Sequence, residues 1–375
     1  MNPTMLAFAP ACKKILRAGK NRVIIFLKRE WGDLRMRVGL LGAGRIGKVH
    51  AQAISSHPDS ELVAVSDAFD ENAQALAKSY GCDVRTSDEI IADRSIEAVL
   101  IATSTDTHSD LIEAAAAAGK AVLCEKPVDL SLERASACLG AVGDAASNIM
   151  IGFNRRFDPG FGALKAAIDA GEIGKPELLS IISFDPAPPP IDYIKVSGGL
   201  FRDMMIHDFD MANFIMGTAP VSISAVGTSV VDPAIGAAGD VDTAAVTMTY
   251  ADGRIAVIKN SRRAAYGYDQ RIEVLGSEGL LQAQNMLENT LVKSTTAGVS
   301  SAKPTYFFLE RYMPAYKAEW TAFVEAVQSR SEMPVNLHDG VAALAMAEAA
   351  TRSAKTGRPV AMADILMILG RGEAA

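Results

Sequence analysis

The stretch that decides the fold is RVGLLGAGRIGKVHAQAI, residues 37–54. Residues 38–41 form a short apolar run of strand length, and residues 48–54 have the composition of a helix. Between them lie Gly42, Gly44 and Gly47 in the pattern G-x-G-x-x-G, in the strand–turn–helix context that gives this pattern meaning. The glycines permit a tight turn, let the backbone approach a diphosphate, and let helix and strand pack closely. The pattern therefore predicts a dinucleotide-binding site at the helix N-terminus.

An acidic residue ends the next predicted strand. The apolar run at residues 61–66 leads into Asp67, about 20 residues after Gly47, the spacing of the acid that hydrogen-bonds a ribose 2′-hydroxyl. A carboxylate there repels a 2′-phosphate, and no arginine occurs in the three residues that follow. The alternative interpretation is a glycine-rich turn with a chance acid downstream. We expect NAD as the cofactor in preference to NADP.

Apolar runs continue to alternate with helical segments as far as residue 156, which predicts a parallel, doubly wound Rossmann sheet. The ligand of such a sheet binds at the carboxyl ends of its strands. Thr103 and Ser104 follow the apolar run at 98–102, and Glu125-Lys126-Pro127 follows the run at 120–124. These residues are therefore candidates for the ligand site.

The pattern changes after residue 156. Segments rich in β-branched residues at 221–231, 243–250 and 255–260 are separated by turn residues, which predicts a large, mostly antiparallel open sheet in an α+β domain. One face of that sheet should cover helices and the cleft, and the other is available to another subunit. The predicted domains are a basic extension at 1–35, a Rossmann domain at 36–156 and a substrate-binding and oligomerisation domain at 157–375.

Composition restricts the class of protein. The formal net charge is −7 and hydrophobic residues make up 49%. An acidic chain disfavours nucleic-acid binding, because phosphate contacts need a basic surface. No apolar run approaches the roughly 18 residues of a membrane span. The four cysteines form no C-x-x-C pair and the five histidines are spread out, which favours a reducing, cytoplasmic compartment and argues against a bound metal.

The first 35 residues differ from the rest. They carry eight Lys or Arg and two acids, with a short apolar run at 23–27. A targeting peptide is one interpretation, but the apolar run is short and no cleavage site of small residues follows it. We expect a disordered tail or a start codon assigned too far upstream, because Met36 stands directly before the first predicted strand.

Several motifs together resemble one enzyme family. They are Gly42–Gly47, Ala102-Thr103-Ser104 with His108, Glu125-Lys126-Pro127, and Ser197-Gly198-Gly199 followed by Asp203 and His207. This combination is similar to the glucose–fructose oxidoreductase, inositol dehydrogenase and MocA-like (Gfo/Idh/MocA) family, over everything from Met36 onward. Three longer stretches, at 152–158, 197–210 and 260–271, most resemble the inositol 2-dehydrogenases of that family.

The resemblance implies a Rossmann fold, a nicotinamide cofactor, oxidation of a cyclic polyol, and a homotetramer assembled through the C-terminal sheet. It also implies that Lys126, Asp203 and His207 are the catalytic residues. Their chemistry agrees with this, since an imidazole with a pKa near 6.5 can accept the hydroxyl proton and an ammonium can stabilise an alkoxide. A helix expected at 201–214 would place Asp203 and His207 on one face, where Asp203 could hold the imidazole or stabilise its charged form.

Two sets of binding residues complete the prediction. The cofactor set is Gly42, Gly44, Arg45, Ile46, Gly47, Asp67, Thr103, Ser104, His108, Glu125 and Lys126. The substrate set is Lys126, Asn154, Arg155, Asp158, Asp203, His207 and Tyr266, since a polyol needs many hydrogen-bonding partners. His108 could equally be a polar residue that opens a helix.

The function predicted is NAD-dependent oxidation of myo-inositol to its 2-keto product, in inositol catabolism. Within the same class, the alternatives are a dehydrogenase of another inositol isomer or of a pyranose sugar. From a different class, the alternative is an inactive NAD-binding sensor, against which the intact Lys126, Asp203 and His207 argue. A metal site built from Asp203, His207, Asp208 and Asp210 is a further possibility, disfavoured because Lys126 would oppose a cation.

Overall fold

The structure is a computed structural model that describes residues 35–372, within a compact unit that begins at Arg35. Nearly all of the basic extension predicted at 1–35 lies outside the described residues. The predicted division of the remainder at residue 156 stays a prediction, because helices from the C-terminal half pack against the first sheet.

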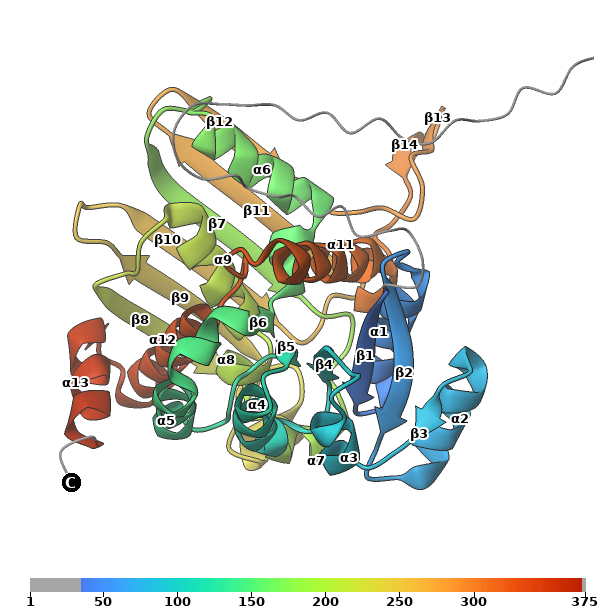
Figure 1. The fold of residues 1–375 in the computed structure, drawn as a ribbon. Coiled ribbons are helices and arrows are strands. Elements are labelled where there is room, and N and C mark those ends of the chain that lie inside the picture. The colour runs from blue at the N-terminus through green and yellow to red at the C-terminus, as the bar shows by residue number, and fades with distance from the viewer. Residues whose placement is uncertain (1–34, 373–375) are drawn as a thin grey trace, which may run out of the picture. The chain divides into compact units, whose positions relative to one another are not determined.

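The first sheet is parallel throughout and has six strands in the order β3-β2-β1-β4-β5-β6 (Figure 1). In chain order the strands are β1 (Met36–Leu41), β2 (Ser60–Ser66), β3 (Asp83–Val84), β4 (Ala98–Ile101), β5 (Ala121–Glu125) and β6 (Ile149–Gly152). The helices between them are α1 (Arg45–Ser56), α2 (Asp70–Tyr80), α3 (Ser87–Ala92), α4 (His108–Ala117) and α5 (Leu132–Val142), with 3-10 turns at Thr105–Thr107 and Gly143–Asn148. This is the doubly wound sheet that the alternating pattern predicts.

The glycines of the first turn are required by close backbone contacts. Gly42 has φ +101°, and a Cβ built on it would lie 2.4 Å from the carbonyl oxygen of Ala102. A Cβ on Gly47 would lie 2.0 Å from the carbonyl oxygen of Gly42. No larger residue can therefore replace either glycine without a backbone shift, as the roles predicted for a tight turn and close helix packing demand.

The second sheet has seven strands in the order β12-β11-β7-β10-β9-β8-β15. They are β7 (Pro176–Phe184), β8 (Ser222–Thr228), β9 (Thr243–Thr249), β10 (Ile255–Ser261), β11 (Asp269–Gly276), β12 (Gly279–Ala283) and β15 (Val360–Ala361). All neighbouring pairs are antiparallel except β7 and β10. The predicted α/β fold class with a mostly antiparallel second sheet is therefore confirmed.

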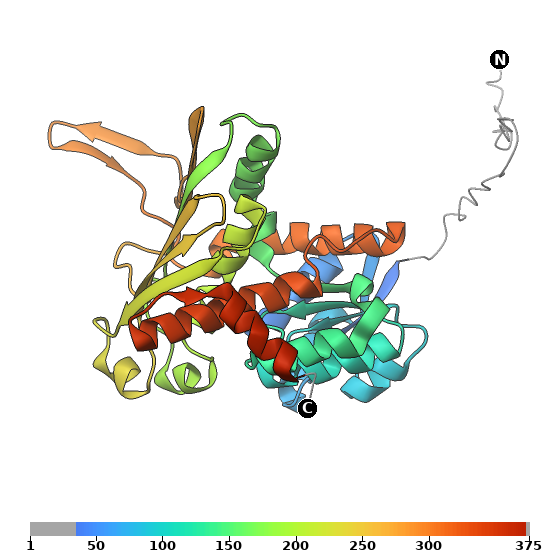
Figure 2. The ribbon, with the colours of Figure 1, turned by 90° about the vertical axis from the view of Figure 1, so that its left-hand side faces the viewer.

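Helices cover one face of the second sheet, and Figure 2 shows α12 lying along it. The helices of the C-terminal half are α6 (Pro159–Asp169), α7 (Ile191–Val196), α8 (Leu200–Asp203), α9 (Ile206–Met216), α10 (Pro233–Ala237), α11 (Phe308–Ser329), α12 (Leu337–Thr356) and α13 (Met362–Gly372). The 3-10 turn Asn154–Phe157 precedes α6, and a hairpin of β13 (Val292–Thr295) and β14 (Gly298–Ser301) projects from the sheet. Along β9, Ala244, Val246 and Met248 are buried while Ala245 and Thr247 are exposed, so one face is core and the other is open.

Two long helices tie the halves together. In α11, Trp320 is buried and its Nε1 donates to Ser60 Oγ at 2.9 Å, beside β2. Just before α12, the carbonyl oxygen of Val335 accepts the backbone N–H of Ile151, in β6, at 3.0 Å. These contacts hold β2 and β6 of the first sheet against α11 and the segment that leads into α12.

The helix expected at 201–214 is interrupted. It forms as α8 and α9, with Met204 and Met205 in a turn between them. The N–H of Met205 reaches back to the carbonyl oxygen of Leu200, which widens the turn, and Lys126 Nζ donates to the carbonyl oxygen of Asp203 at 2.7 Å. A tertiary contact at the end of α8 thus accompanies the break, which local sequence does not encode.

Candidate active site

The loop between β1 and α1 is built to receive an anion. Gly44 is the N-cap of α1 and has no side chain to bond the free N–H groups of the first turn. A Cβ on Gly44 would meet no atom within 4 Å, so space is open beside it. Arg45 and Ile46 are the first residues of the helix. Uncapped N–H groups, open space and the helix dipole fit a diphosphate at this position.

Asp67 is fastened to the same loop. Its Oδ2 accepts the N–H of Ala43 at 2.6 Å, and its Oδ1 accepts the N–H of Phe69 at 2.8 Å. The carboxylate at the end of β2 is thus held beside the glycine-rich turn, as the spacing predicts for a ribose partner. These residues together fit NAD, which would supply the hydride acceptor for an alcohol oxidation.

His108 and Glu125 are more enclosed than the sequence suggests. His108 is 1% exposed, with Nδ1 2.8 Å from the carbonyl oxygen of Pro127 and Nε2 3.2 Å from that of Thr103. Burial lowers its pKa, and a neutral imidazole has a single N–H, so the ring can donate to only one of these two carbonyl oxygens. Glu125 turns toward α1, where its Oε1 lies 2.8 Å from His50 Nε2. Direct contact of Thr103, Ser104, His108 and Glu125 with the cofactor stays a prediction.

Lys126 and Asp203 meet across the two halves of the chain. Besides its bond to the Asp203 carbonyl oxygen, Lys126 Nζ lies 3.7 Å from the Asp203 carboxylate. Tyr193 donates to Oδ1 of that carboxylate at 2.8 Å, and Arg262 donates to Oδ2 at 3.2 Å. The carboxylate therefore faces the lysine, the phenol and the guanidinium.

His207 lies in the first turn of α9 and is half-buried. Its Nδ1 is buried without a hydrogen-bond partner among the described residues, and its ring meets Phe153 edge to face at 5.9 Å. No hydrogen bond joins it to Asp203 within residues 35–372, so the imidazole is not held as the sequence suggested. Burial, and then the charges of Lys126 and Arg155, hold the pKa of His207 well below 6.5. The ring is neutral near pH 7 and can accept a proton.

The predicted substrate residues divide into two groups. Asn154 and Arg155 are buried in the turn that follows β6. Asp158 instead caps α6 through the N–H groups of Gly160 and Phe161 and pairs with Arg311. Tyr266 donates to Asp269 at 2.6 Å. The structure thus gives Asp158 and Tyr266 partners outside the Lys126–Asp203–His207 group, and their contact with a substrate stays a prediction.

Two aspartates considered as metal ligands are already paired. Asp208 accepts Arg155 Nη1 at 2.5 Å, together with Ser183 and Asn260. Asp210 accepts Arg156 through both oxygens. A carboxylate bound to a guanidinium in this way is not a free metal ligand.

Three residues near the site were missed from the sequence. Tyr193 and Arg262 both bond Asp203, as above. Asp185 follows β7 and its carboxylate accepts no hydrogen bond from the described residues, while burial raises its pKa to about 6. The rule that selected Thr103 and Lys126 does not select Asp185, because it concerns the carboxyl ends of parallel strands and the second sheet is mostly antiparallel.

Family comparisons agree with this geometry. Residues 36–153 match the oxidoreductase family with an NAD-binding Rossmann fold, and residues 161–282 match the GFO/IDH/MocA C-terminal domain. The chain belongs to the Gfo/Idh/MocA family of oxidoreductases. It is an NAD-dependent oxidoreductase, and the predictions of family, Rossmann fold and cofactor are confirmed.

Three relatives illustrate how much of the chain is covered. An inositol 2-dehydrogenase of Rhizobium meliloti is 52% identical over 330 residues, covering 88% of this chain and 100% of the relative. The crystal structure of a myo-inositol dehydrogenase from Corynebacterium glutamicum is 46% identical with a TM-score of 0.85, covering 88% of this chain and 99% of that one. A scyllo-inositol dehydrogenase of Lactobacillus casei, solved with NAD(H) and scyllo-inositol, is 29% identical with a TM-score of 0.81, covering 88% of this chain and 99% of that one.

Proposed function

We propose that this oxidoreductase oxidises myo-inositol at its 2-hydroxyl to the 2-keto product. The observation that carries the proposal is the meeting of Lys126 Nζ, the Asp203 carboxylate and a neutral His207 beside the strand ends of the Rossmann sheet. The similarity to an inositol 2-dehydrogenase and a myo-inositol 2-dehydrogenase supports the choice of substrate class.

The proposed chemistry assigns one task to each group. His207 takes the hydroxyl proton, since its ring is neutral at working pH. Lys126 donates to the same oxygen as alkoxide character develops. Asp203 holds the ammonium through its carbonyl and carboxylate oxygens. When bound, NAD would accept the hydrogen on the carbinol carbon as hydride. The substrate would thus lose one hydride, which carries both electrons, and one proton.

The remaining hydroxyls of the ring need partners on the cleft walls. We assign this role first to Arg155, whose charge contributes to the lowered pKa of His207, and to Asn154 beside it in the same turn. We add Asp185 as a proposed acceptor, because its carboxylate is free of protein donors among the described residues and lies near Arg262 and Asp203. Asp158 and Tyr266 rank below these three, because both are engaged elsewhere.

The alternative substrate is another inositol isomer, scyllo-inositol. A scyllo-inositol 2-dehydrogenase of Bacillus subtilis is 36% identical over 329 residues, so isomer choice within the inositols is the open alternative. The test is NADH formation across a panel of myo-inositol, scyllo-inositol, other inositol isomers and aldopyranoses. The proposal predicts the highest kcat/KM with myo-inositol. A higher value with scyllo-inositol or an aldose would replace the substrate, and no turnover with any of them would favour the sensor interpretation.

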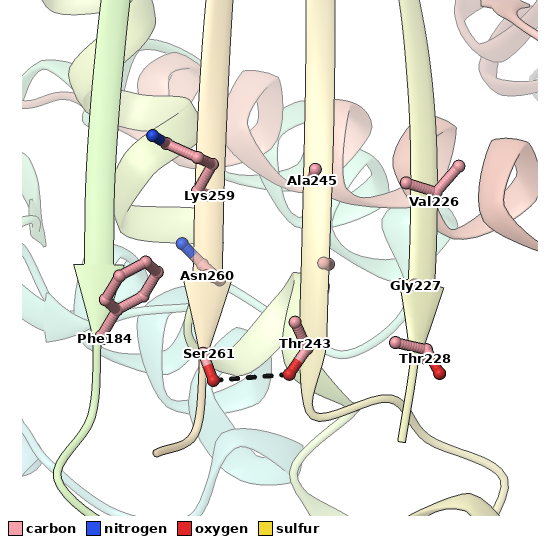
Figure 3. Close-up of a pocket in the computed structure, with 10 residues that line it drawn as sticks. Phe184, Val226, Gly227, Thr228, Thr243, Ala245, Lys259, Asn260 and Ser261 are labelled. Carbon is pink, nitrogen blue, oxygen red and sulfur yellow. Dashed lines mark hydrogen bonds between the residues drawn. The ribbon is translucent and has the colours of Figure 1, made fainter. Parts of the chain in front are cut away.

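The proposed assembly is a homotetramer formed through the open face of the second sheet. Figure 3 shows the hollow on that face, lined by Phe184, Val226, Ala245 and neighbouring residues of β7 to β10. Val226 is 67% exposed there, and apolar exposure on an open sheet face is typical of an interface. Sedimentation should give a tetramer, and Val226→Asp should reduce its size. A monomeric wild type would contradict the proposal.

The proposed setting is inositol catabolism in the cytoplasm. The cysteines that the structure describes, Cys82, Cys124 and Cys138, are all free thiols, as a reducing compartment favours. Across residues 35–372, no helix combines the length and apolarity that crossing a bilayer requires. Growth of a deletion strain on inositol as sole carbon source tests the catabolic role, which predicts loss of growth.

A further inference from the structure

A tyrosine outside the predicted site reaches the centre of it. Tyr193 lies on α7, in the segment that joins β7 to α8 and contains the rigid run Pro188–Pro190. Tyr193 is 44% exposed, yet its hydroxyl donates to Asp203 Oδ1 at 2.8 Å. Ile194, the next residue, is 3% exposed and anchors α7. The phenol is therefore held at the cleft by local structure on both sides.

The bond to Tyr193 fixes which way the Asp203 carboxylate faces. Oδ1 accepts the phenol and lies 3.7 Å from Lys126 Nζ, while Oδ2 accepts Arg262. With these donors in place, the carboxylate makes no hydrogen bond to His207 within the described residues. The phenol remains a donor at neutral pH, because burial and then the charge of Asp203 raise the pKa of Tyr193. The other charged groups facing the phenol are Arg262 and Arg45.

We propose that Tyr193 is a positioning residue for the oxidation: its phenol keeps the Asp203 carboxylate on the Lys126 side of the site. Lys126 is then held toward the substrate oxygen from two sides, by the carbonyl and the carboxylate of Asp203. His207 is left without a competing carboxylate and meets the substrate proton directly. This inference rests on the role proposed for Asp203.

The first test removes only the hydroxyl. Tyr193→Phe should lower kcat about 10- to 100-fold, the range that follows from losing a hydrogen bond to a charged group. The dissociation constant for NAD and the melting temperature should remain unchanged, because the ring and the glycine-rich loop are intact. Tyr306→Phe is the matched control, since Tyr306 is 60% exposed and lies outside the site. A kcat for Tyr193→Phe equal to that of the control would overturn the proposal.

The second test asks whether Tyr193 acts through Asp203. Single-turnover rates are measured for Tyr193→Phe, Asp203→Asn and the double variant. If the phenol works by orienting the carboxylate, adding Tyr193→Phe to Asp203→Asn should change the rate by less than about twofold. Multiplicative losses would overturn the proposal and leave Tyr193 with an independent effect. A wild-type rate for Asp203→Asn alone would instead refute the role proposed for Asp203, and with it this inference.

Discussion

Replacing Glu319 by leucine should stabilise the protein. Glu319 lies on α11 where it packs against α1, is 0% exposed, and has no hydrogen-bond partner for either carboxyl oxygen among the described residues. Burying a polar group without a partner costs about 1–3 kcal/mol. Leucine removes that cost and fills similar volume, so we expect a gain of roughly 1–3 kcal/mol and a rise of several degrees in Tm.

The same residue should make stability fall as pH rises. Burial, and then the charge of Glu125, raise the pKa of Glu319 well above its usual 4.5. Above pH 4.5 the unfolded chain releases this proton while the folded chain keeps it, so each further pH unit costs the wild type up to about 1.4 kcal/mol. The loss stops at the folded pKa. Glu319→Gln cannot ionise, and its stability relative to wild type should therefore increase with pH.

The assay is thermal unfolding of wild type, Glu319→Leu and Glu319→Gln at one protein concentration and at several pH values, because assembly makes Tm depend on concentration. Glu325→Leu is the control, since Glu325 is an exposed acid on the same helix and should change stability by no more than about 0.5 kcal/mol. A leucine variant less stable than wild type, or a glutamine variant whose difference from wild type does not vary with pH, would show that Glu319 is paired and charged in the folded protein.

Three further outcomes follow from the site. Asp67→Ser should shift the preference for NAD over NADP at least tenfold, or ~1.4 kcal/mol, and should weaken NAD binding because the bond to the Ala43 N–H is lost. Titration with each cofactor measures both effects, and an unchanged ratio would place Asp67 away from the ribose. His207→Ala should lower kcat about 10²–10⁴-fold with little effect on the Kd of NAD. Because the pKa of His207 is depressed, the kcat/KM of the wild type should fall only below pH 6.5, which a pH profile measures. Asp208→Ala should cost about 3–5 kcal/mol in denaturant unfolding, since it leaves the Arg155 charge buried and unpaired; a loss below about 1 kcal/mol would contradict this.

The cofactor-binding half of the fold could be predicted from the sequence, because its steric requirements fix the positions of particular glycines and of one acid. Gly42 and Gly47 stand where a Cβ would strike backbone atoms, and Asp67 bonds an N–H of the same loop. The Gly47–Gly42 and Asp67–Ala43 contacts join residues no more than 24 apart, and they leave a fixed spacing in the sequence. Gly42 meets Ala102 just after the neighbouring strand β4. The strand ends could be placed for the same reason, because parallel strands bring their carboxyl ends to one edge.

The rest of the site could not be predicted, because it depends on contacts between residues far apart in the sequence. Asp158 reads as a polar residue near a site, but its partner Arg311 lies in α11, far along the chain. The break between α8 and α9 accompanies a contact of Lys126 with the Asp203 carbonyl oxygen, whereas helical periodicity over 201–214 is uninterrupted. Tyr193 has no distinguishing local pattern, since a tyrosine on a short helix gains its meaning only from what it touches.

The charge of Lys126 links the base to the alcohol that it deprotonates. The ammonium contributes to lowering the pKa of His207, which weakens the base but keeps it unprotonated at neutral pH. The same charge stabilises the alkoxide and so makes the substrate hydroxyl more acidic. The lysine charge thus lowers the pKa of the proton donor, the substrate hydroxyl, and of the proton acceptor, His207. The difference between the two pKa values changes little, so the driving force for proton transfer is kept. The fraction of enzyme with an unprotonated His207 increases. Once His207 carries the proton, two cations face each other, and that repulsion favours release of the proton before the next turnover.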